Sequence, residues 1–126
     1  MSKQAVATHN APDAIGPYSQ AVIAGDTIYC SGQIALDPST MQLVGSGIEE
    51  QTRQVMANLE AVLEAAGSDF SKVVKFSIFL AEMNDFPIVN EIYGAYLSGD
   101  LPARETVEVS RLPKGARIEI SCIALK

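Results

Sequence analysis

Apolar and polar residues alternate over residues 101–120, on both sides of the turn sequence Pro113-Lys114-Gly115. A period of two places successive side chains on opposite faces of a strand. The polar face of the first predicted strand carries Arg104, Thr106 and Glu108, and that of the second carries Arg117, Glu119 and Ser121. A guanidinium and a carboxylate on successive strands can meet in a cleft. The alternative is a solvated polar face whose surface ion pairs are worth about 0–1 kcal/mol.

A long amphipathic helix is predicted to start at Ser46. Ser46 and Glu49 have the spacing of a capping box, and Gly67 suits the left-handed position after the last turn. Apolar or small residues in steps of three and four form the buried stripe, which consists of Ile48, Thr52, Val55, Leu59, Val62 and Ala66.

A shorter second helix is predicted after residue 84. Asn84 or Asp85 is expected to cap it, and Pro87 falls in its first turn, where a missing N–H costs little. Its apolar stripe consists of Phe86, Val89, Ile92 or Tyr93, and Tyr96, and residues 98–102 end it.

Four further apolar runs predict strands at residues 5–8, 18–24, 27–31 and 72–80. The order β, β, β, α, β, α, β, β favours an α+β fold in a single domain, residues 1–126. We expect one mixed six-stranded sheet with two helices packed on one face. The uncovered face would carry Val73, Phe79, Ile123 and Leu125. Because exposed apolar surface of this kind marks an interface, a homo-oligomer is expected.

Composition and charge narrow the class of protein. A chain of 126 residues with 48% apolar residues can bury a core, and a net charge of −6 disfavours binding to phosphate backbones. The chain lacks a membrane-spanning apolar run and a signal-peptide block, so we expect a soluble cytoplasmic protein. Cys30 and Cys122 lie in apolar runs and are expected to be buried free thiols. His9 is the one histidine, which disfavours a protein-made metal site and a histidine-dependent triad.

Four spaced motifs resemble those of the RidA (YjgF) family, and the likeness extends over essentially the whole chain. In chain order they are Asn10-Ala11-Pro12 with Ile15-Gly16-Pro17-Tyr18-Ser19-Gln20, then Ser31-Gly32-Gln33-Ile34, then Asn84-Asp85-Phe86 with Val89-Asn90 and Tyr93, and finally Pro102-Ala103-Arg104 with Val107-Glu108-Val109, Leu112-Pro113 and Ile118-Glu119-Ile120.

The resemblance implies a fold like that of the small trimeric chorismate mutases, in which three sheets form a barrel-like centre with clefts between neighbouring subunits. It also implies hydrolysis of 2-imino acids and their enamine tautomers to 2-oxo acids and ammonia. The substrates would include 2-iminobutanoate and 2-iminopropanoate (2-aminoacrylate). Neither a metal nor an organic cofactor would be used.

Carried over by motif, the resemblance gives the central roles to Arg104 and Glu119. Arg104 would bind the substrate carboxylate, because a planar guanidinium makes two parallel hydrogen bonds to it. Glu119 would hold or polarise the attacking water, and the alternative is a surface carboxylate in a strand. Positioning plus one acid/base group at about 10²–10⁴-fold would be sufficient, since imines already hydrolyse in water.

Four other positions complete the implied pocket. Gly32 would offer a backbone N–H and close approach, or would merely end a hairpin strand. Tyr18 would wall the pocket and Asn90 would add a polar group; the alternatives are a core tyrosine and a solvated helix asparagine. Thr106 stands where the family commonly has cysteine, so it can hydrogen-bond a ligand but cannot act as a thiol. Glu105 replaces a small residue and must meet either solvent or a cation.

Two other functions remain to be separated from deamination. A non-enzymatic module that senses a 2-oxo acid or similar carboxylate would use the same cleft, and there Glu119 would be dispensable. Nucleic-acid cleavage has been attached to some relatives. The acidic balance, the lone histidine and the lack of a basic or aromatic stripe argue against it.

Overall fold

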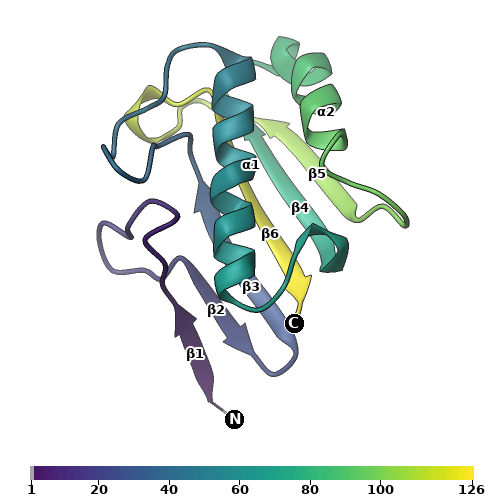
Figure 1. Ribbon diagram of the computed structural model, residues 1–126. Coiled ribbons are helices and arrows are strands. Elements are labelled where there is room, and N and C mark those ends of the chain that lie inside the picture. The colour runs from purple at the N-terminus through teal and green to yellow at the C-terminus, as the bar shows by residue number, and fades with distance from the viewer. Residues whose placement is uncertain (1) are drawn as a thin grey trace.

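The computed structural model describes residues 2–126, which form six strands and two α-helices in the predicted order (Figure 1). The strands are β1 (Lys3–Val6), β2 (Ala21–Ala24), β3 (Thr27–Gln33), β4 (Val73–Leu80), β5 (Ala103–Glu108) and β6 (Ile118–Leu125). The helices are α1 (Ile48–Ala65) and α2 (Phe86–Gly94), and short 3₁₀ helices lie at Phe70–Lys72, Met83–Asp85 and Pro113–Gly115.

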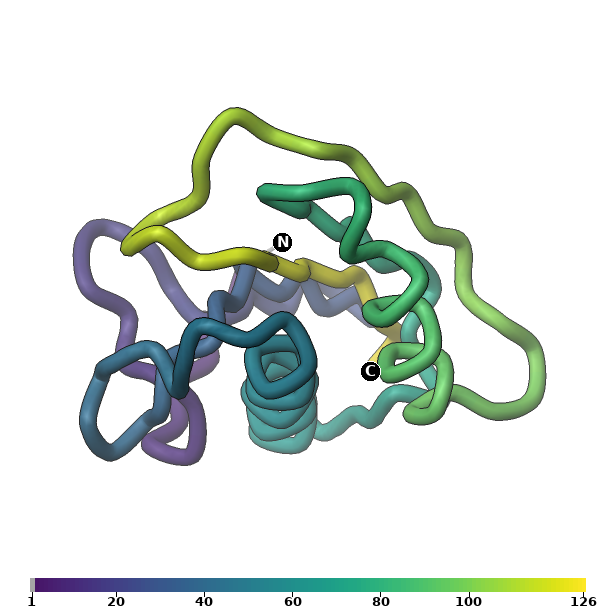
Figure 2. The backbone as a smooth tube through the Cα atoms, turned by 90° about the horizontal axis from the view of Figure 1, so that it is seen from above, coloured from purple at the N-terminus to yellow at the C-terminus, as the bar shows by residue number. Residues whose placement is uncertain are grey.

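One mixed sheet joins the strands in the order β1-β2-β3-β6-β4-β5. β4 and β5 pair in parallel, and the other four neighbouring pairs are antiparallel. Both helices lie on the same face of this sheet, as the two views at right angles show (Figures 1 and 2). The predicted α+β fold, with a mixed six-stranded sheet and two helices on one face, is confirmed.

The hydrophobic core lies between the helices and the covered face of the sheet. The buried stripe of α1 includes Val55, Met56, Leu59, Val62 and Leu63, and the sheet contributes Ile28, Phe76, Ile78, Leu80, Ile118 and Ile120. Full burial of each such side chain contributes about 1.5–3 kcal/mol. The core therefore follows from the period of the apolar residues, which predicted the same faces of α1 and β6.

The start of α1 differs by one residue from the predicted capping box at Ser46 and Glu49. Gly47 is the N-cap, and its N–H donates to Oε1 of Glu50 at 2.9 Å. This start makes Ile48 the first helical residue and buries it in the core. The end of α1 is as predicted, because Gly67 follows it with φ of 83°.

A bulge at the start of β4 reverses the predicted faces of Val73 and Val74. The register between β4 and β6 shifts between Val73 and Lys75, so an extra residue is inserted in β4. Val73 is therefore buried and Val74 exposed, and the prediction that Val73 lies on the uncovered face is wrong. The uncovered face does carry Phe79, Ile123 and Leu125.

Cys30 on β3 and Cys122 on β6 are free and buried, as predicted, and lie directly opposite each other in register. A hydrogen bond with Cys30, together with burial, raises the pKa of the Cys122 thiol well above its usual value. Cys122 is therefore a poor nucleophile. Within residues 2–126, neither α-helix has the length and apolar character of a membrane span.

Candidate functional site

Glu119, near the start of β6, lines a cavity of about 410 Å³. The irregular segment before β2, the end of β3 and the residues that follow β3 supply most of the remaining lining, including Tyr18, Gly32, Ile34 and Leu36. Tyr18 is 52% exposed, which excludes the alternative of a core tyrosine. The structure thus brings together three of the predicted site residues around one cavity.

Gly32 and the carboxylate of Glu119 are in close contact. A Cβ on Gly32 would lie 2.5 Å from Oε2 of Glu119 and 2.8 Å from its carboxyl carbon, so the carboxylate occupies space that only glycine leaves free. Burial raises the pKa of Glu119. A half-buried carboxyl with a raised pKa is suited to exchange protons with a bound water.

Arg104 lies at a second cavity, of about 480 Å³, between β5 and α2. Its Nη1 donates to Oδ1 of Asn90 at 2.6 Å. Its guanidinium carbon lies 5.0 Å from the ring centre of Phe86 and 5.6 Å from that of Tyr93. The hydrogen bond and the two cation–π contacts hold the guanidinium in place, and its other N–H groups can donate to a ligand.

Phe86 and Tyr93 were predicted only as members of the buried stripe of α2, and their contact with Arg104 was missed. Phe86 precedes Asn90 by four residues and Tyr93 follows it by three, so all three side chains share one face of the helix. That spacing, followed by an arginine on the next strand, is the sequence pattern that would have indicated the contact.

Arg104 and Glu119 lie on opposite faces of the sheet in one chain. Arg104 pairs in register with Phe76, which is buried beneath the helices. Glu119 pairs with Phe79, three positions further along β4 and therefore on the other face. The polar faces of the two strands do not meet within one chain, because β4 separates β5 from β6 and the faces are reversed between them.

Glu105 and Thr106, the two residues that depart from the family pattern, lie on opposite faces of β5. The hydroxyl oxygen of Thr106 is buried and has no hydrogen-bond partner within residues 2–126. Glu105 accepts a hydrogen bond from Oγ of Ser77 at 3.0 Å, and its carboxylate lies 3.5 Å from Nζ of Lys75. The partner of Glu105, left open by the sequence, therefore includes a cation.

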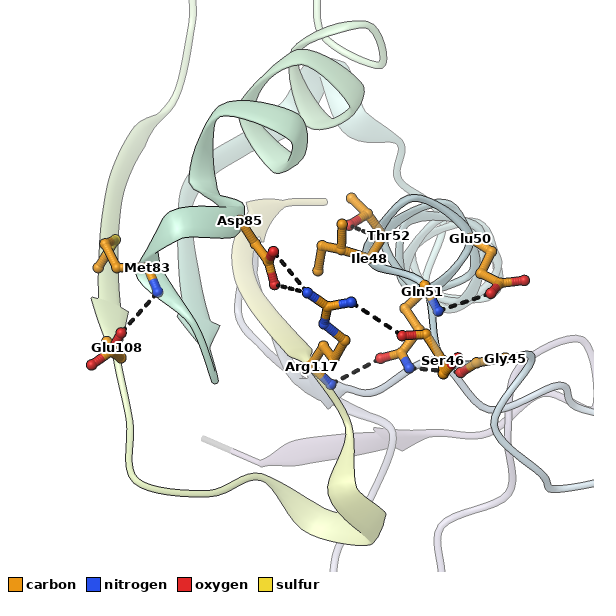
Figure 3. A network of polar contacts seen from close by, with 11 residues as sticks. Gly45, Ser46, Ile48, Glu50, Gln51, Thr52, Met83, Asp85, Glu108 and Arg117 are labelled. Carbon is orange, nitrogen blue, oxygen red and sulfur yellow. Dashed lines mark hydrogen bonds and ion pairs between the residues drawn. The ribbon is translucent and has the colours of Figure 1, made fainter.

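Asp85 precedes α2 as predicted, but its carboxylate binds Arg117 and does not cap the helix. Nη2 of Arg117 lies 2.8 Å and 2.7 Å from the two carboxylate oxygens, and Nη1 donates to the carbonyl of Ser46 at 3.2 Å (Figure 3). This pair fixes the start of α2 to the start of β6.

Gln51 extends the same network into α1. Its side chain is 1% exposed, accepts a hydrogen bond from the backbone N–H of Arg117 at 2.9 Å and donates to the carbonyl of Gly45 at 2.7 Å (Figure 3). The network therefore anchors the start of β6 and the loop before α1 to the same helix. Within residues 2–126, no group of three or more His, Cys, Asp or Glu side chains is arranged to hold a metal ion.

These features define a small α+β protein with one sheet, covered on one face, and with an arginine and a glutamate at separate cavities. A profile of the family described as Endoribonuclease L-PSP matches residues 8–126. The chain therefore belongs to this family, which is the RidA (YjgF) family that its four motifs resemble.

Relatives and solved structures match the chain over nearly its whole length. A protein of Mus musculus named 2-iminobutanoate/2-iminopropanoate deaminase is 52% identical over 124 residues, which cover 98% of this chain and 92% of that protein. The Homo sapiens protein of the same name is 50% identical, over 98% of this chain and 90% of its own. A crystal structure of a Rid-family protein from Yersinia pestis is 51% identical, with a TM-score of 0.97 over 99% of this chain and 100% of that one.

Proposed function

We propose that this protein hydrolyses 2-imino acids and their enamine tautomers, such as 2-iminobutanoate and 2-iminopropanoate (2-aminoacrylate), to 2-oxo acids and ammonia. The observation that carries the proposal is 50–52% identity, over 98% of this chain, to proteins named for this activity. The site supplies the groups that such a reaction needs, because Arg104 is a held guanidinium and Glu119 is a half-buried carboxyl.

In the proposed mechanism, Arg104 binds the substrate carboxylate through paired hydrogen bonds. Glu119 accepts a proton from a water molecule as the water oxygen bonds to the carbon of the C=N group, and it passes that proton to the imine nitrogen. The product of this step is a carbinolamine. Its C–N bond then breaks as the hydroxyl proton moves to the nitrogen, so that ammonia leaves and the 2-oxo acid remains. None of these proposed steps uses a cofactor.

The remaining predicted site residues are proposed to surround these two groups. Gly32 and Tyr18 share the cavity of Glu119 and would contact the part of the substrate that faces the water. Asn90 would act on the substrate and also keep Arg104 in place. Thr106 lies two residues from Arg104 on the same face of β5 and is the proposed neighbour of the bound carboxylate.

We also propose that three copies of the RidA-like domain, residues 1–126, form a homotrimer whose clefts combine Arg104 of one copy with Glu119 of the next. A shared site is supported by the position of these residues on opposite faces of one sheet. The uncovered face offers apolar surface for the contact, since Tyr29 and Val107 are 50% and 43% exposed. Free cysteines support a cytoplasmic location. The negative charge supports small-molecule rather than nucleic-acid partners.

A coupled assay tests the proposed activity. A threonine dehydratase generates the imine, and release of 2-oxobutanoate is followed with and without the purified protein. We expect Arg104→Ala and Glu119→Gln each to lower the acceleration by about 10²-fold or more. The control variants Arg53→Ala and Glu64→Gln change exposed residues of α1 and should keep it. Full acceleration by both site variants would contradict the proposal, and binding of 2-oxobutanoate without acceleration by the wild type would indicate a carboxylate sensor.

Mixing two inactive variants tests whether the site is shared between copies. Arg104→Ala and Glu119→Gln chains, unfolded together and refolded, should form mixed assemblies in which some clefts receive both intact residues. Random assembly of equal amounts into a closed ring restores about one quarter of the sites. No recovery of activity in mixed assemblies would show that each site is built within one chain.

A further inference from the structure

The outer wall of the Glu119 cavity is formed by residues 7–20, between β1 and β2. This segment contains neither helix nor strand, yet Pro12, Ile15 and Tyr18 all line the cavity. Ile15 is 66% exposed and Tyr18 is more than half exposed, so burial in the core does not hold either side chain. Something other than regular secondary structure must hold this wall against β3.

The buried side chain of Gln20 closes the segment on itself. Gln20 is 3% exposed. Its Oε1 accepts a hydrogen bond from the backbone N–H of Thr8 at 2.7 Å, and its Nε2 donates to the carbonyls of Pro12 at 2.7 Å and Thr8 at 3.0 Å. A third carbonyl, that of Ala11, lies 3.4 Å from the same nitrogen. One amide group thus joins the beginning of the wall to its end.

The end of the wall is also tied to β3, beside Gly32. The backbone N–H of Ser31 donates to the carbonyl of Gln20 at 3.0 Å, and Oγ of Ser31 donates to the carbonyl of Ser19 at 2.6 Å. Residues 13–18 therefore form a closed loop whose two ends are joined through Gln20, and whose second end is tied to the sheet through Ser31.

We propose that Gln20 is a positioning residue of the deaminase site, which holds the wall formed by Pro12 and Tyr18 against the bound acid. This inference rests on the proposed function, because it assigns the wall to substrate binding. Glu119 lies on β6 and not on the wall, so loss of the clamp should weaken substrate binding while the chemical step is retained. Weaker binding of substrate and transition state alike raises KM and leaves kcat unchanged.

The test compares two buried glutamines. Gln20→Met keeps the length of the side chain but removes its hydrogen bonds, and we expect KM to rise about five- to tenfold with kcat unchanged. Gln51→Met is the matched control, because the buried side chain of Gln51 on α1 also accepts a backbone N–H and donates to backbone, but its partners, Arg117 and Gly45, lie outside the wall. Both variants should lower the melting temperature, and only Gln20→Met should raise KM.

Two further measurements keep the inference testable if Gln20→Met folds poorly or the wild type proves inactive. Ser31→Ala removes one tie to β3 and should raise KM by a smaller factor. Amide hydrogen exchange reports the clamp without any activity, because Thr8 should lose protection in Gln20→Met and keep it in Gln51→Met.

The outcomes separate this inference from the deaminase proposal. A wild type that does not accelerate imine hydrolysis would overturn the deaminase proposal, and with it the assignment of the wall to substrate. An active wild type whose KM is unchanged by Gln20→Met and Ser31→Ala, or is raised equally by Gln51→Met, would overturn the role of Gln20 alone. Unchanged exchange at Thr8 would overturn the clamp itself.

Discussion

Gly32 and Glu119 show how a single side chain position can determine the geometry of the site. A Cβ on residue 32 would lie 2.5 Å from Oε2 of Glu119. Gly32→Ala should therefore displace the carboxylate from the position in which it is proposed to orient the attacking water, and lower kcat by about 10–100-fold. The melting temperature should hardly change, because the end of a flexible side chain can move. The coupled assay and a thermal melt measure the two effects.

A double variant shows whether this loss of rate acts through the carboxylate. In a Glu119→Ala background, Gly32→Ala should have no further effect, since the group that it displaces has been removed. Equal losses in both backgrounds would mean that Gly32 contributes through its backbone instead.

The raised pKa of Glu119 also predicts that the stability of the protein depends on pH. Burial raises its pKa in the folded chain, so the folded state binds this proton more tightly than the unfolded chain does. The favourable effect on stability is present below the ordinary carboxyl pKa and is lost as the pH rises through the raised pKa. Glu119→Gln should therefore be more stable than wild type at neutral pH, with a difference that vanishes in acid. Urea unfolding over this range measures it, and a variant that is less stable at neutral pH would contradict the assignment.

Thr106→Val should raise the free energy of unfolding by about 1 kcal/mol, because it replaces a buried hydroxyl without a partner by a methyl group of similar size. Thr52→Val is the control of opposite sign, since Oγ1 of Thr52 donates to the carbonyl of Ile48 at 2.7 Å. Urea unfolding of both variants measures the difference. If the hydroxyl of Thr106 binds the substrate, the same variant raises KM in the coupled assay.

Among the elements, α2 and β6 depend on the ion pair between Asp85 and Arg117. Asp85→Ala should lower the free energy of unfolding by about 1–3 kcal/mol, because a partly buried guanidinium loses its carboxylate. The loss is smaller than for a fully buried pair, since 36% of the Arg117 side chain is exposed. Urea unfolding at constant pH measures this value.

The exposed pair of Glu49 and Arg53 on α1 is the matched comparison. Its charged atoms lie 3.8 Å apart with more than half of each side chain exposed, so Glu49→Ala should cost no more than about 0.5 kcal/mol. If Asp85→Ala and Glu49→Ala lower the free energy of unfolding equally, burial of Asp85 adds nothing to its interaction with Arg117.

The elements themselves were largely predictable from the sequence, because the apolar period determines which face of α1 and of β6 is buried. β5 is the exception, since its apolar residue Val107 is exposed on the uncovered face. The period did not locate the bulge at Val73 and Val74, since an inserted residue reverses the faces on one side of it without changing composition. It also did not distinguish Ser46 from Gly47 as the cap of α1. Both have a glutamate three residues later, and in the structure Gly47 is the N-cap, with its N–H bonded to Glu50.

In the whole molecule, the uncovered face of the sheet is the proposed contact between copies. Tyr29→Glu places a charge on that face and should reduce the assembly from three chains to one, with loss of the deaminase activity. Light scattering after size-exclusion chromatography measures the mass. Ile88→Glu, at an exposed apolar position of α2, is the control and should leave the assembly intact. A Tyr29→Glu protein of unchanged mass would place the interface elsewhere.

The motifs identified the candidate site residues, but the sequence did not show how they are distributed over the molecule. Tyr18, Gly32 and Glu119 share one cavity, and Asn90 and Arg104 share another. Alternation along a strand reveals that Arg104 and Glu119 each belong to a polar face, but not which side of the sheet that face occupies. The side depends on the pairing register with β4, which places Arg104 beside Phe76 and Glu119 beside Phe79.

In the proposed trimer, the separation of the arginine from the glutamate also links turnover to the amount of protein present. A solitary folded chain would contain every residue of the proposed site and yet form none of its clefts. Dilution that dissociates the copies should then abolish activity without unfolding the chain. Specific activity would rise with protein concentration, so a low concentration alone would be enough to abolish the activity of this protein.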